Sequence, residues 1–534
     1  MDNKLIIQEG NIALGIEFGS TRIKSVLTDL YGNILASGDF TWENQFKDGY
    51  WTYDLDIIDR GLRESYASLK RDVKDNYGIS LTKFKGLGIS AMMHGYLAFD
   101  ENDNLLVPFR TWRNSTAANA AKKLTEVFNF NVPARYSISH LYQAIIDNEE
   151  HVGKISYFTT LAGYIHYRLT GEKVLGIGDA SGMFPIDSKT KQYDEEKLSK
   201  FDSLIAEKGY KWKLKDILPK IKLAGEDAGR LSKEGIAFIG DKDIEDLAGV
   251  CIVAPPEGDA GTGMTATNSV RKKTGNVSAG TSVFAMVVME NALKGVHGQI
   301  DIVTTPMGES VAMVHCNNCT SDINAWAGVF AGFLKAMGVE ADMGKVYTAM
   351  FASALSGAID GGNITSYNYF SGEDITKLSS GRPIVVRGEN ADFTFENFMR
   401  VNLYSAVATL RIGLEILEKE NVKIDKMIGH GGFFKTPKVG NVIMSQAMKA
   451  PVTTLETAGE GGSYGMALLT IYDIKCLLMG YDKPLEEYLD DEIFAGSTGV
   501  TIEADESEIK GFDIFMERYV KGLEIEKICG DILS

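Results

Sequence analysis

Residue types that bind phosphate and metal ions stand close together near the start of the chain. The stretch 13–40 reads ALGIEFGSTRIKSVLTDLYGNILASGDF, so Glu17 precedes Gly19, Ser20 and Thr21, and Lys24 follows. N–H groups and hydroxyls in such a turn are donors for phosphate oxygens, and a carboxylate can hold hydrated Mg²⁺. The stretch therefore predicts a phosphate site. An ordinary hairpin with a solvated acid and lysine is the alternative.

Two strands, and not a strand and a helix, are expected to hold this turn. The two commonest phosphate loops need a helix directly after their glycines. Here β-branched residues alternate after Gly19, and a Tyr31-Gly32-Asn33 turn precedes another apolar run. This pattern is typical of an antiparallel hairpin.

The same device recurs about half a chain later, in TGNVSAGTSVFAMVVMEN at 274–291. Strand-like residues flank Gly280, Thr281 and Ser282 without a helix between them. Two such hairpins predict a duplicated architecture in which each copy opens one domain, and 534 residues are too many for one typical core. We therefore predict domains at 1–272 and 273–534.

Composition narrows the class of protein. A hydrophobic content of 44% with 24% charged residues is ordinary for a soluble globular chain, and the net charge of −17 disfavours nonspecific binding to nucleic acid or anionic membranes. Neither a signal peptide nor a membrane-spanning run of about 18 apolar residues is found. Five scattered cysteines suit a reducing cytoplasm. Cys316 and Cys319 have the spacing of half a zinc site, and buried free thiols are the simpler interpretation.

The remaining elements alternate in a pattern typical of α/β proteins. Glycine loops in βαβα units lie at strand ends beside helix N-termini, where nucleotides commonly bind. The expected elements are a strand at 84–92, a helix at 160–172 ending at Gly171, a strand at 250–254, a core helix at 398–419, a glycine turn at 429–432, a helix at 437–448, a strand at 452–455, a turn at 458–462 and a helix at 463–472.

The order of these motifs resembles that of the FGGY family of carbohydrate kinases, within the actin/hexokinase/Hsp70 superfamily, from Ala13 to about Lys521. The motifs that carry the resemblance are GIEFGSTRIKSVL, ISAMMHGYLAFD, TWRNST, LTGEKVLGIGDASGMFPID, VAPPEGDAGTGM, SAGTSVFA, YNYFSGED and GHGGFFKTPKVGNVIMSQAMKAPV. The resemblance implies an α/β fold of two RNase H-like domains with a central cleft. The N-terminal domain would bind sugar and the C-terminal domain ATP.

The resemblance also implies roles for single residues. Asp259 is expected to be the general base that accepts the proton of a sugar hydroxyl, with a turn-stabilising acid as the alternative. Glu17 is expected beside Mg²⁺. Phosphate contacts are expected from Gly19, Ser20, Thr21, Lys24, Gly280, Thr281 and Ser282, and nucleotide contacts from Gly431, Gly432 and Phe433.

Sugar contacts are expected from Met93, His94, Trp112, Asn114 and Asp179. These supply hydrogen-bonding groups, an aromatic wall and an adaptable apolar contact. Taken without the motifs, His94 and Trp112 would be ordinary core residues. Asp179 could instead hold the expected strand at 178–183 without touching sugar.

Three departures from the family pattern bear on these roles. Glu17 stands where aspartate is usual and reaches one methylene further. Ala260 stands where an amide that often contacts sugar is usual. His430 lies within the adenosine-motif glycines, and Phe433 and Phe434 follow them, either to stack on adenine or to pack.

These observations predict a cytoplasmic kinase that uses Mg-ATP to phosphorylate the terminal hydroxyl of a ketopentose, either L-ribulose or D-xylulose. The Met-His-Gly stretch favours pentuloses over glycerol. The expected partners are the sugar and ATP, without nucleic acid or membrane, and the oligomeric state is open, a homodimer included. A superfamily ATPase without a sugar substrate and a sugar-sensing protein with weak catalysis are the alternatives.

Overall fold

The protein is described by a computed structural model that covers residues 2–455 and 461–533. It divides into two compact units, neither of them continuous in sequence. The first contains Met1–Val270, Ile302–Val311 and Glu460–Gly496, and the second contains Arg271–Asp301, Ala312–Gly459 and Ser497–Ser534. No sequence pattern indicated that 302–311 and 460–496 return to the first unit. The division into 1–272 and 273–534, with sugar and ATP assigned to the two parts, stays a prediction.

The first unit is built on a mixed sheet with the strand order β13-β6-β1-β2-β3. Its strands are β1 (Ile12–Phe18), β2 (Arg22–Asp29), β3 (Ile34–Thr41), β6 (Gly86–Ala91) and β13 (Ile252–Val253), with β14 (Glu257–Gly258) also paired to β6. β1 is antiparallel to β2 and parallel to β6. The predicted hairpin and the predicted strand at 84–92 are therefore confirmed.

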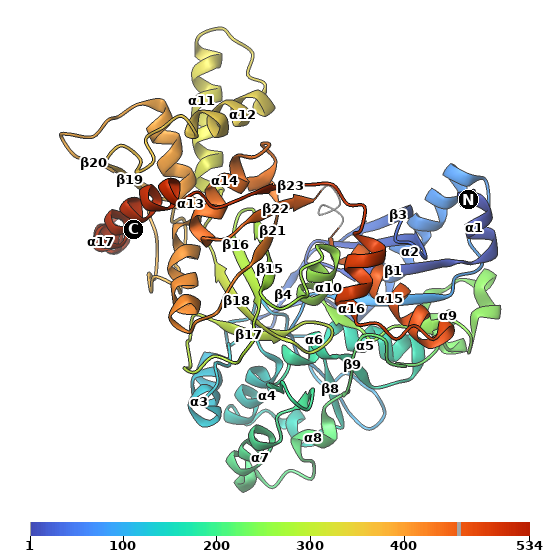
Figure 1. The fold of residues 1–534 in the computed structure, drawn as a ribbon. Helices are drawn as coiled ribbons and strands as arrows, with labels where there is room; N and C mark the ends of the chain where they lie inside the picture. Colours follow the sequence, from blue (N-terminus) through green and yellow to red (C-terminus); the bar gives the residue numbers. More distant parts are fainter. Residues whose placement is uncertain (1, 456–460, 534) are drawn as a thin grey trace. The chain divides into compact units, whose positions relative to one another are not determined.

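Helices pack closely on this sheet. α15 (Gly461–Met479) lies on β1 and β6, and α10 (Asp259–Ala266) packs against α15 (Figure 1). The approach is close because a Cβ built on Gly15 would lie 2.1 Å from the Ser463 carbonyl oxygen. α2 (Leu55–Tyr77) covers β3. Other helices of this unit include α3 (Ala118–Phe128), α4 (Ser137–Ile146), α5 (Leu161–Thr170) and α6 (Ile177–Ser181).

The second unit repeats the sheet of the first. Its strands follow the order β18-β16-β15-β21-β22-β23. They are β15 (Thr274–Ala279), β16 (Val283–Val288), β18 (Ser310–Cys316), β21 (Lys426–His430), β22 (Val452–Leu455) and β23 (Gly499–Ile502). β15 is antiparallel to β16 and parallel to β21, as β1 is to β2 and β6. The second hairpin is thus present, and it occupies the same place in its sheet as the first.

The helices of the second unit follow the sequence pattern closely. α13 (Phe395–Lys419) begins three residues before the predicted start, and its Thr394 side chain caps the Asn397 N–H. Its apolar residues Leu403, Val407, Leu410, Leu414 and Leu417 are buried, as expected of a core helix. α14 (Val439–Met448) begins two residues later than expected. α11 (Ser321–Ala336) and α12 (Met343–Ala354) form a hairpin that projects from this unit, and α17 (Glu506–Ile532) ends the chain (Figure 1).

Three segments differ from the sequence-based expectation or lie partly outside the described residues. The segment expected as a strand at 178–183 begins within the short helix α6, because a buried carboxylate from elsewhere holds the first N–H groups of that helix. The strand at 250–254 is reduced to β13, and Val250 is exposed. Of the turn expected at 458–462, residues 458–460 lie outside the described residues, while the helix after it is present as α15.

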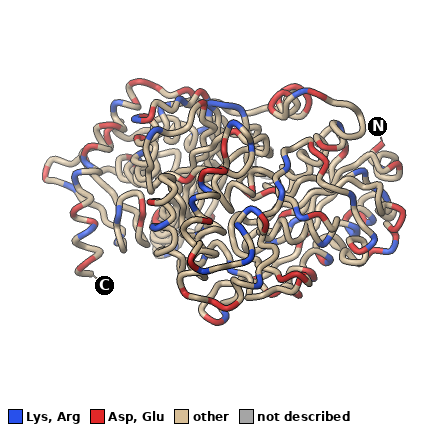
Figure 2. Tube along the Cα trace, turned by 90° about the horizontal axis from the view of Figure 1, so that it is seen from below, with Lys and Arg blue, Asp and Glu red and all other residues tan. Residues whose placement is uncertain are grey.

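Charge is distributed along the chain without one dominant segment. Acidic and basic positions are interspersed along the whole trace (Figure 2). Among residues 2–455 and 461–533, no helix combines the length and the apolar character needed to cross a bilayer.

Candidate functional site

Hydrogen bonds to backbone carbonyl groups hold the first hairpin turn in place. The Gly19 N–H donates to the Arg22 carbonyl at 3.0 Å, and the Trp42 indole N–H donates to the Gly19 carbonyl at 2.8 Å. The Tyr53 hydroxyl donates to the Ser20 carbonyl. Within the described part of the chain, the N–H groups of Ser20 and Thr21 donate no hydrogen bond to another residue. The turn thus offers donors of the kind that bind phosphate.

Glu17 lies at the end of β1, opposite Lys24 of β2. Its Oε2 accepts the Ser463 N–H at 3.2 Å, at the start of α15. Burial and the negative charge of Asp259 raise the pKa of Glu17 to about 7, although Lys24 and the N–H groups act in the opposite direction. Glu17 is therefore a helix-bound carboxyl that can gain or lose a proton near neutral pH.

Asp259 begins α10 and is accessible to solvent. Its Oδ1 accepts the Met93 N–H at 3.1 Å. Although Asp259 is accessible, the protein packed around its carboxyl group removes part of the group's hydration and so raises its pKa above the usual value, while the N–H groups of Met93 and Ala260 oppose the shift. An accessible carboxylate of raised pKa is suited to accept a proton. The position agrees with the expected base, whose role stays a prediction.

Met93 and His94 follow β6 and are both buried. His94 has a positive φ of 67° and stacks on Tyr136 with 4.9 Å between ring centroids. Its Nδ1 lies 3.1 Å from the Gly182 carbonyl, and its Nε2 accepts from Arg135 Nε at 3.3 Å. Burial lowers the pKa of His94 to about 3, so the ring is neutral at pH 7.

Arg135 was not singled out by the sequence. It lies against His94, and its positive charge lowers the pKa of Asp259. Within NVPARYSISH, the stretch 131–140, it precedes a helix and matches no motif that carried the resemblance. His94 and Asp259, the residues on which Arg135 acts, lie 41 and 124 positions away in the sequence. No local pattern could therefore indicate this cation.

Asp179 is almost fully buried in α6, with 1% of its surface exposed. Oδ2 accepts the Thr160 hydroxyl at 2.5 Å, whereas Oδ1 has no hydrogen-bond partner among the described residues. Burial, together with Asp259, raises the pKa of Asp179 to about 7. A Cβ built on Gly258 would lie 3.4 Å from Oδ1, so Asp179 lies directly behind the segment that leads to Asp259.

Trp112 and Asn114 differ in their surroundings. Trp112 has 40% of its surface exposed, which leaves its ring available to a ligand. Asn114 is buried, and both its amide oxygen and its NH₂ group bond the backbone of Trp51, at 2.8 and 2.9 Å. The NH₂ group also donates to the Thr111 carbonyl. The structure therefore gives Asn114 a supporting position, and its predicted contact with sugar is untested.

The second hairpin turn has the same kind of support. The Gly280 N–H donates to the Ser282 carbonyl at 2.9 Å. The Thr320 hydroxyl and N–H both donate to the Gly280 carbonyl, and the Cys319 N–H donates to the Thr281 carbonyl. Hydrogen bonds thus fix the carbonyl groups on one side of this turn. The N–H groups and hydroxyls on the other side remain as donors, as in the first hairpin turn.

The glycine turn after β21 reaches this second hairpin. Gly431 has φ of 100°, and a Cβ built on it would lie 2.5 Å from the Ala279 carbonyl oxygen. Gly431 and Gly432 are exposed. The Phe433 side chain is fully buried and packs edge-on against Phe351. Of the two interpretations for this ring, the structure favours packing, and the predicted nucleotide contact would have to come from its backbone.

The cysteines are unpaired, and Cys251, Cys316 and Cys319 are buried. The part of the chain that the structure describes contains no group of three or more His, Cys, Asp or Glu side chains arranged to hold a metal ion. Cys316 and Cys319 are thus buried and form no disulfide, as the buried-thiol interpretation expects, and Cys319 supports the second hairpin through its backbone.

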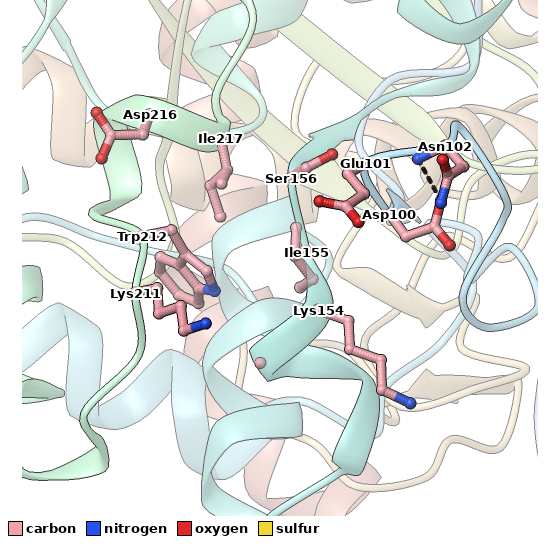
Figure 3. Close-up of a pocket in the computed structure, with 11 residues that line it drawn as sticks. Asp100, Glu101, Asn102, Lys154, Ile155, Ser156, Lys211, Trp212, Asp216 and Ile217 are labelled. Carbon is pink, nitrogen blue, oxygen red and sulfur yellow. Dashed lines mark hydrogen bonds between the residues drawn. The ribbon is translucent and has the colours of Figure 1, made fainter.

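Mg²⁺ binds through one or two carboxylates and keeps several waters. Glu17 with Asp259 nearby fits that requirement without a three-ligand cluster, because the charge of Asp259 acts on Glu17. A surface pocket of about 550 Å³ lies apart from these residues (Figure 3). Trp212, Lys154 and Lys211 are among its lining residues, and no predicted site residue lines it.

Comparison with known proteins bears on the fold. Residues 12–245 match the N-terminal domain, and residues 275–474 the C-terminal domain, of the FGGY family of carbohydrate kinases. A xylulose kinase of Haemophilus influenzae is 22% identical over 415 residues, 75% of this chain and 79% of that protein. A gluconokinase of Bacillus licheniformis is 26% identical over 204 residues, 35% of this chain and 37% of that protein.

A solved structure agrees over nearly the whole chain. Ligand-bound xylulose kinase from Lactobacillus acidophilus matches with a TM-score of 0.77 at 17% identity, covering 98% of this chain and 100% of that one. The predicted two-domain α/β fold is thereby confirmed.

Proposed function

The chain belongs to the FGGY family of carbohydrate kinases, and on this premise we propose that it transfers the γ-phosphoryl group of ATP to the terminal hydroxyl of a ketopentose, L-ribulose or D-xylulose. The observation that carries the proposal is Asp259. It combines solvent access, a fixed N–H contact from Met93 and a raised pKa at the start of a helix.

Asp259 accepts the proton of the attacking sugar hydroxyl as the phosphoryl group moves. A hydroxyl is a weak nucleophile, so a nearby carboxylate that takes its proton lowers the barrier. The Met93 N–H holds Oδ1 and thereby orients the carboxylate. The exposed ring of Trp112 and the apolar Met93 are proposed to contact the sugar, while His94 and Asp179 support the site from behind.

The nucleotide is proposed to bind through backbone donors. The turn residues Gly19, Ser20 and Thr21, with Lys24, and the second-unit residues Gly280, Thr281 and Ser282 supply N–H groups, hydroxyls and one cation for phosphate oxygens. Gly431, Gly432 and the Phe433 backbone lie beside Ala279 and are proposed to hold the nucleoside. Mg²⁺ held near Glu17 would offset phosphate charge when bound.

A sugar acid is the second candidate substrate. Arg135 is held against His94 and acts electrostatically on Asp259, so a guanidinium lies in the region proposed for the sugar. Guanidinium groups bind carboxylates with charge-assisted hydrogen bonds. A gluconokinase among the relatives is consistent with this alternative.

The test is a coupled assay of ADP release with Mg-ATP against ketopentoses, ketohexoses, aldonic acids, glycerol and polyols. Asp259→Asn is expected to lower kcat by about 10²–10⁴-fold, because a general base contributes about that much. Its Kd for sugar and for ATP, measured by calorimetry, should change little, because the amide keeps the shape of the carboxylate.

The outcomes separate the candidate functions. Turnover with a pentulose that Asp259→Asn loses would support the proposal, whereas turnover only with aldonic acids would select the second candidate. ATP hydrolysis that no sugar stimulates would place the chain with the superfamily ATPases. Binding of sugar without phosphoryl transfer would indicate a sugar sensor.

A further inference from the structure

Glu257 is a buried acidic residue that none of the roles above uses. Only 2% of its surface is exposed, and it stands two positions before Asp259. Its backbone belongs to β14, where it pairs with Ser90 of β6, the strand that leads to Met93. A buried carboxyl group is costly unless it is hydrogen-bonded, so its contacts need an explanation.

The Glu257 carboxylate bridges to a different element. Oε1 accepts the Gly178 N–H at 3.1 Å and Oε2 accepts the Asp179 N–H at 3.0 Å. These donors lie in the first turn of α6, where N–H groups have no partner within the helix. Two parallel hydrogen bonds to one carboxylate fix both the position and the direction of the helix start.

The surroundings are shaped to admit this carboxylate. A Cβ built on Gly176 would lie 2.4 Å from Oε1, and one built on Gly178 would lie 2.3 Å from Oε2. The Gly176 N–H also donates to the Pro256 carbonyl at 2.8 Å, which ties the two segments together beside the carboxylate. The space that two side chains would fill is thus taken by Glu257.

The bridge connects the two carboxylates nearest to the proposed chemistry. Asp179 receives the second hydrogen bond, and its Oδ1 lies beside Gly258, the residue between Glu257 and Asp259. We propose that Glu257 is a positioning residue for phosphoryl transfer, which fixes Asp179 relative to Asp259 and so keeps the sugar hydroxyl aligned with the base. The inference rests on the proposed function.

Glu257→Gln tests the bridge with little change in volume. Its amide oxygen can still accept one N–H, but its NH₂ group would face the other donor, so one hydrogen bond is lost. A buried donor left without an acceptor costs about 1–3 kcal/mol, which corresponds to about 5–150-fold. We expect the sugar KM to rise at least about tenfold and kcat to fall, while the ATP KM stays within about twofold.

A second readout is independent of activity. Hydrogen–deuterium exchange of a peptide spanning 174–184 should be faster in Glu257→Gln than in the wild type. Gly178→Ala disrupts the same bridge by a change in α6, because the added Cβ must displace Oε2 of Glu257. It should give the same kinetic pattern, and the double variant should be less impaired than the sum of the two single changes.

Asp473→Asn is the matched control. Asp473 is a buried carboxyl of the same unit that accepts a backbone N–H, that of Gly225. Asp473→Asn should leave the sugar KM unchanged. Equal effects of Asp473→Asn and Glu257→Gln on the sugar KM would overturn the positioning role, as would faster exchange at 174–184 with unchanged kinetic constants.

Failure of the proposed function would look different. If the wild type turned over no sugar, the proposed function and the catalytic part of this inference would both be wrong. Faster exchange at 174–184 in Glu257→Gln would then still establish the bridge as a structural contact. Sugar turnover by the wild type with kinetic constants unaltered in Glu257→Gln would overturn this inference alone.

Discussion

Glu17 brings a titratable group into the interior beside a helix start, and this has a consequence for stability. Burial raises its pKa from 4.5 to about 7, so between these values the folded chain keeps a proton that the unfolded chain releases. The contribution of Glu17 to the free energy of unfolding therefore falls as the pH rises from about 4.5 to 7, by up to about 3 kcal/mol, and is constant above that range.

Glu17→Gln removes this dependence while keeping an acceptor for the Ser463 N–H. Relative to the wild type, the variant should gain melting temperature between pH 5 and pH 8 in buffer without Mg²⁺, as measured by scanning calorimetry. Glu9→Gln, at an exposed position at the end of α1 (Asn3–Glu9), is the control and should shift the melting temperature equally at both values. A constant difference between Glu17→Gln and the wild type would contradict the assigned pKa.

Residue types near a motif could be predicted, but their partners could not. Glu17, Asp259 and the two Gly-hydroxyl turns were found because each stands in a short pattern. Arg135 and Glu257 were missed, since their roles arise from contacts with segments distant in sequence. Asn114 shows the reverse case, because its residue type suggested sugar while its amide is engaged by Trp51.

At the scale of elements, the contact between α10 and α15 governs where Asp259 lies. α10 begins at Asp259, and a Cβ built on Gly465 of α15 would lie 1.9 Å from the Thr262 carbonyl oxygen. Backbone cannot yield as a flexible side chain can, so Gly465→Ala must push the two helices apart. Overpacking of this kind costs about 1–3 kcal/mol.

Gly465→Ala should therefore lower the free energy of unfolding, measured by urea denaturation, even though alanine is the better helix former. Gly263→Ala is the matched control on the facing helix, because no atom lies within 4 Å of a Cβ built there. It should be neutral or should stabilise by about 0.4–1 kcal/mol. If both substitutions stabilised the protein, the close approach of these helices would be wrong.

Elements with a strong local pattern were the most predictable. The hairpins, α13 and the βαβ segment around β21 appear with boundaries within a few residues, because alternation and helical period are local properties. α6 was misassigned as a strand. Its short helix depends on the Glu257 carboxylate, whose contribution no local pattern records.

At the scale of the whole molecule, the two compact units do not correspond to the two halves of the sequence. α15 comes from the C-terminal part of the chain, yet it packs on β1 and β6 of the first unit. Residues 302–311 also belong to this unit, and the Thr304 N–H donates to the Ser181 hydroxyl at 3.0 Å. The duplicated hairpin suggested two consecutive domains. It carries no information about which later segments of the chain belong to the first unit.

A fragment comprising residues 1–272 should therefore fail to fold cooperatively, although it includes the whole N-terminal family match. Without α15, the faces of β1 and β6 that it covers would be open to water, and removing apolar burial costs about 25 cal/mol per Å². Fusing 460–496 to the fragment through a flexible Gly/Ser linker should restore a sigmoidal thermal transition in circular dichroism. The same fusion carrying Gly465→Ala should melt at a lower temperature. A cooperative transition in the unfused fragment would show that the first unit does not need α15, and would return the boundary to the predicted position between 272 and 273.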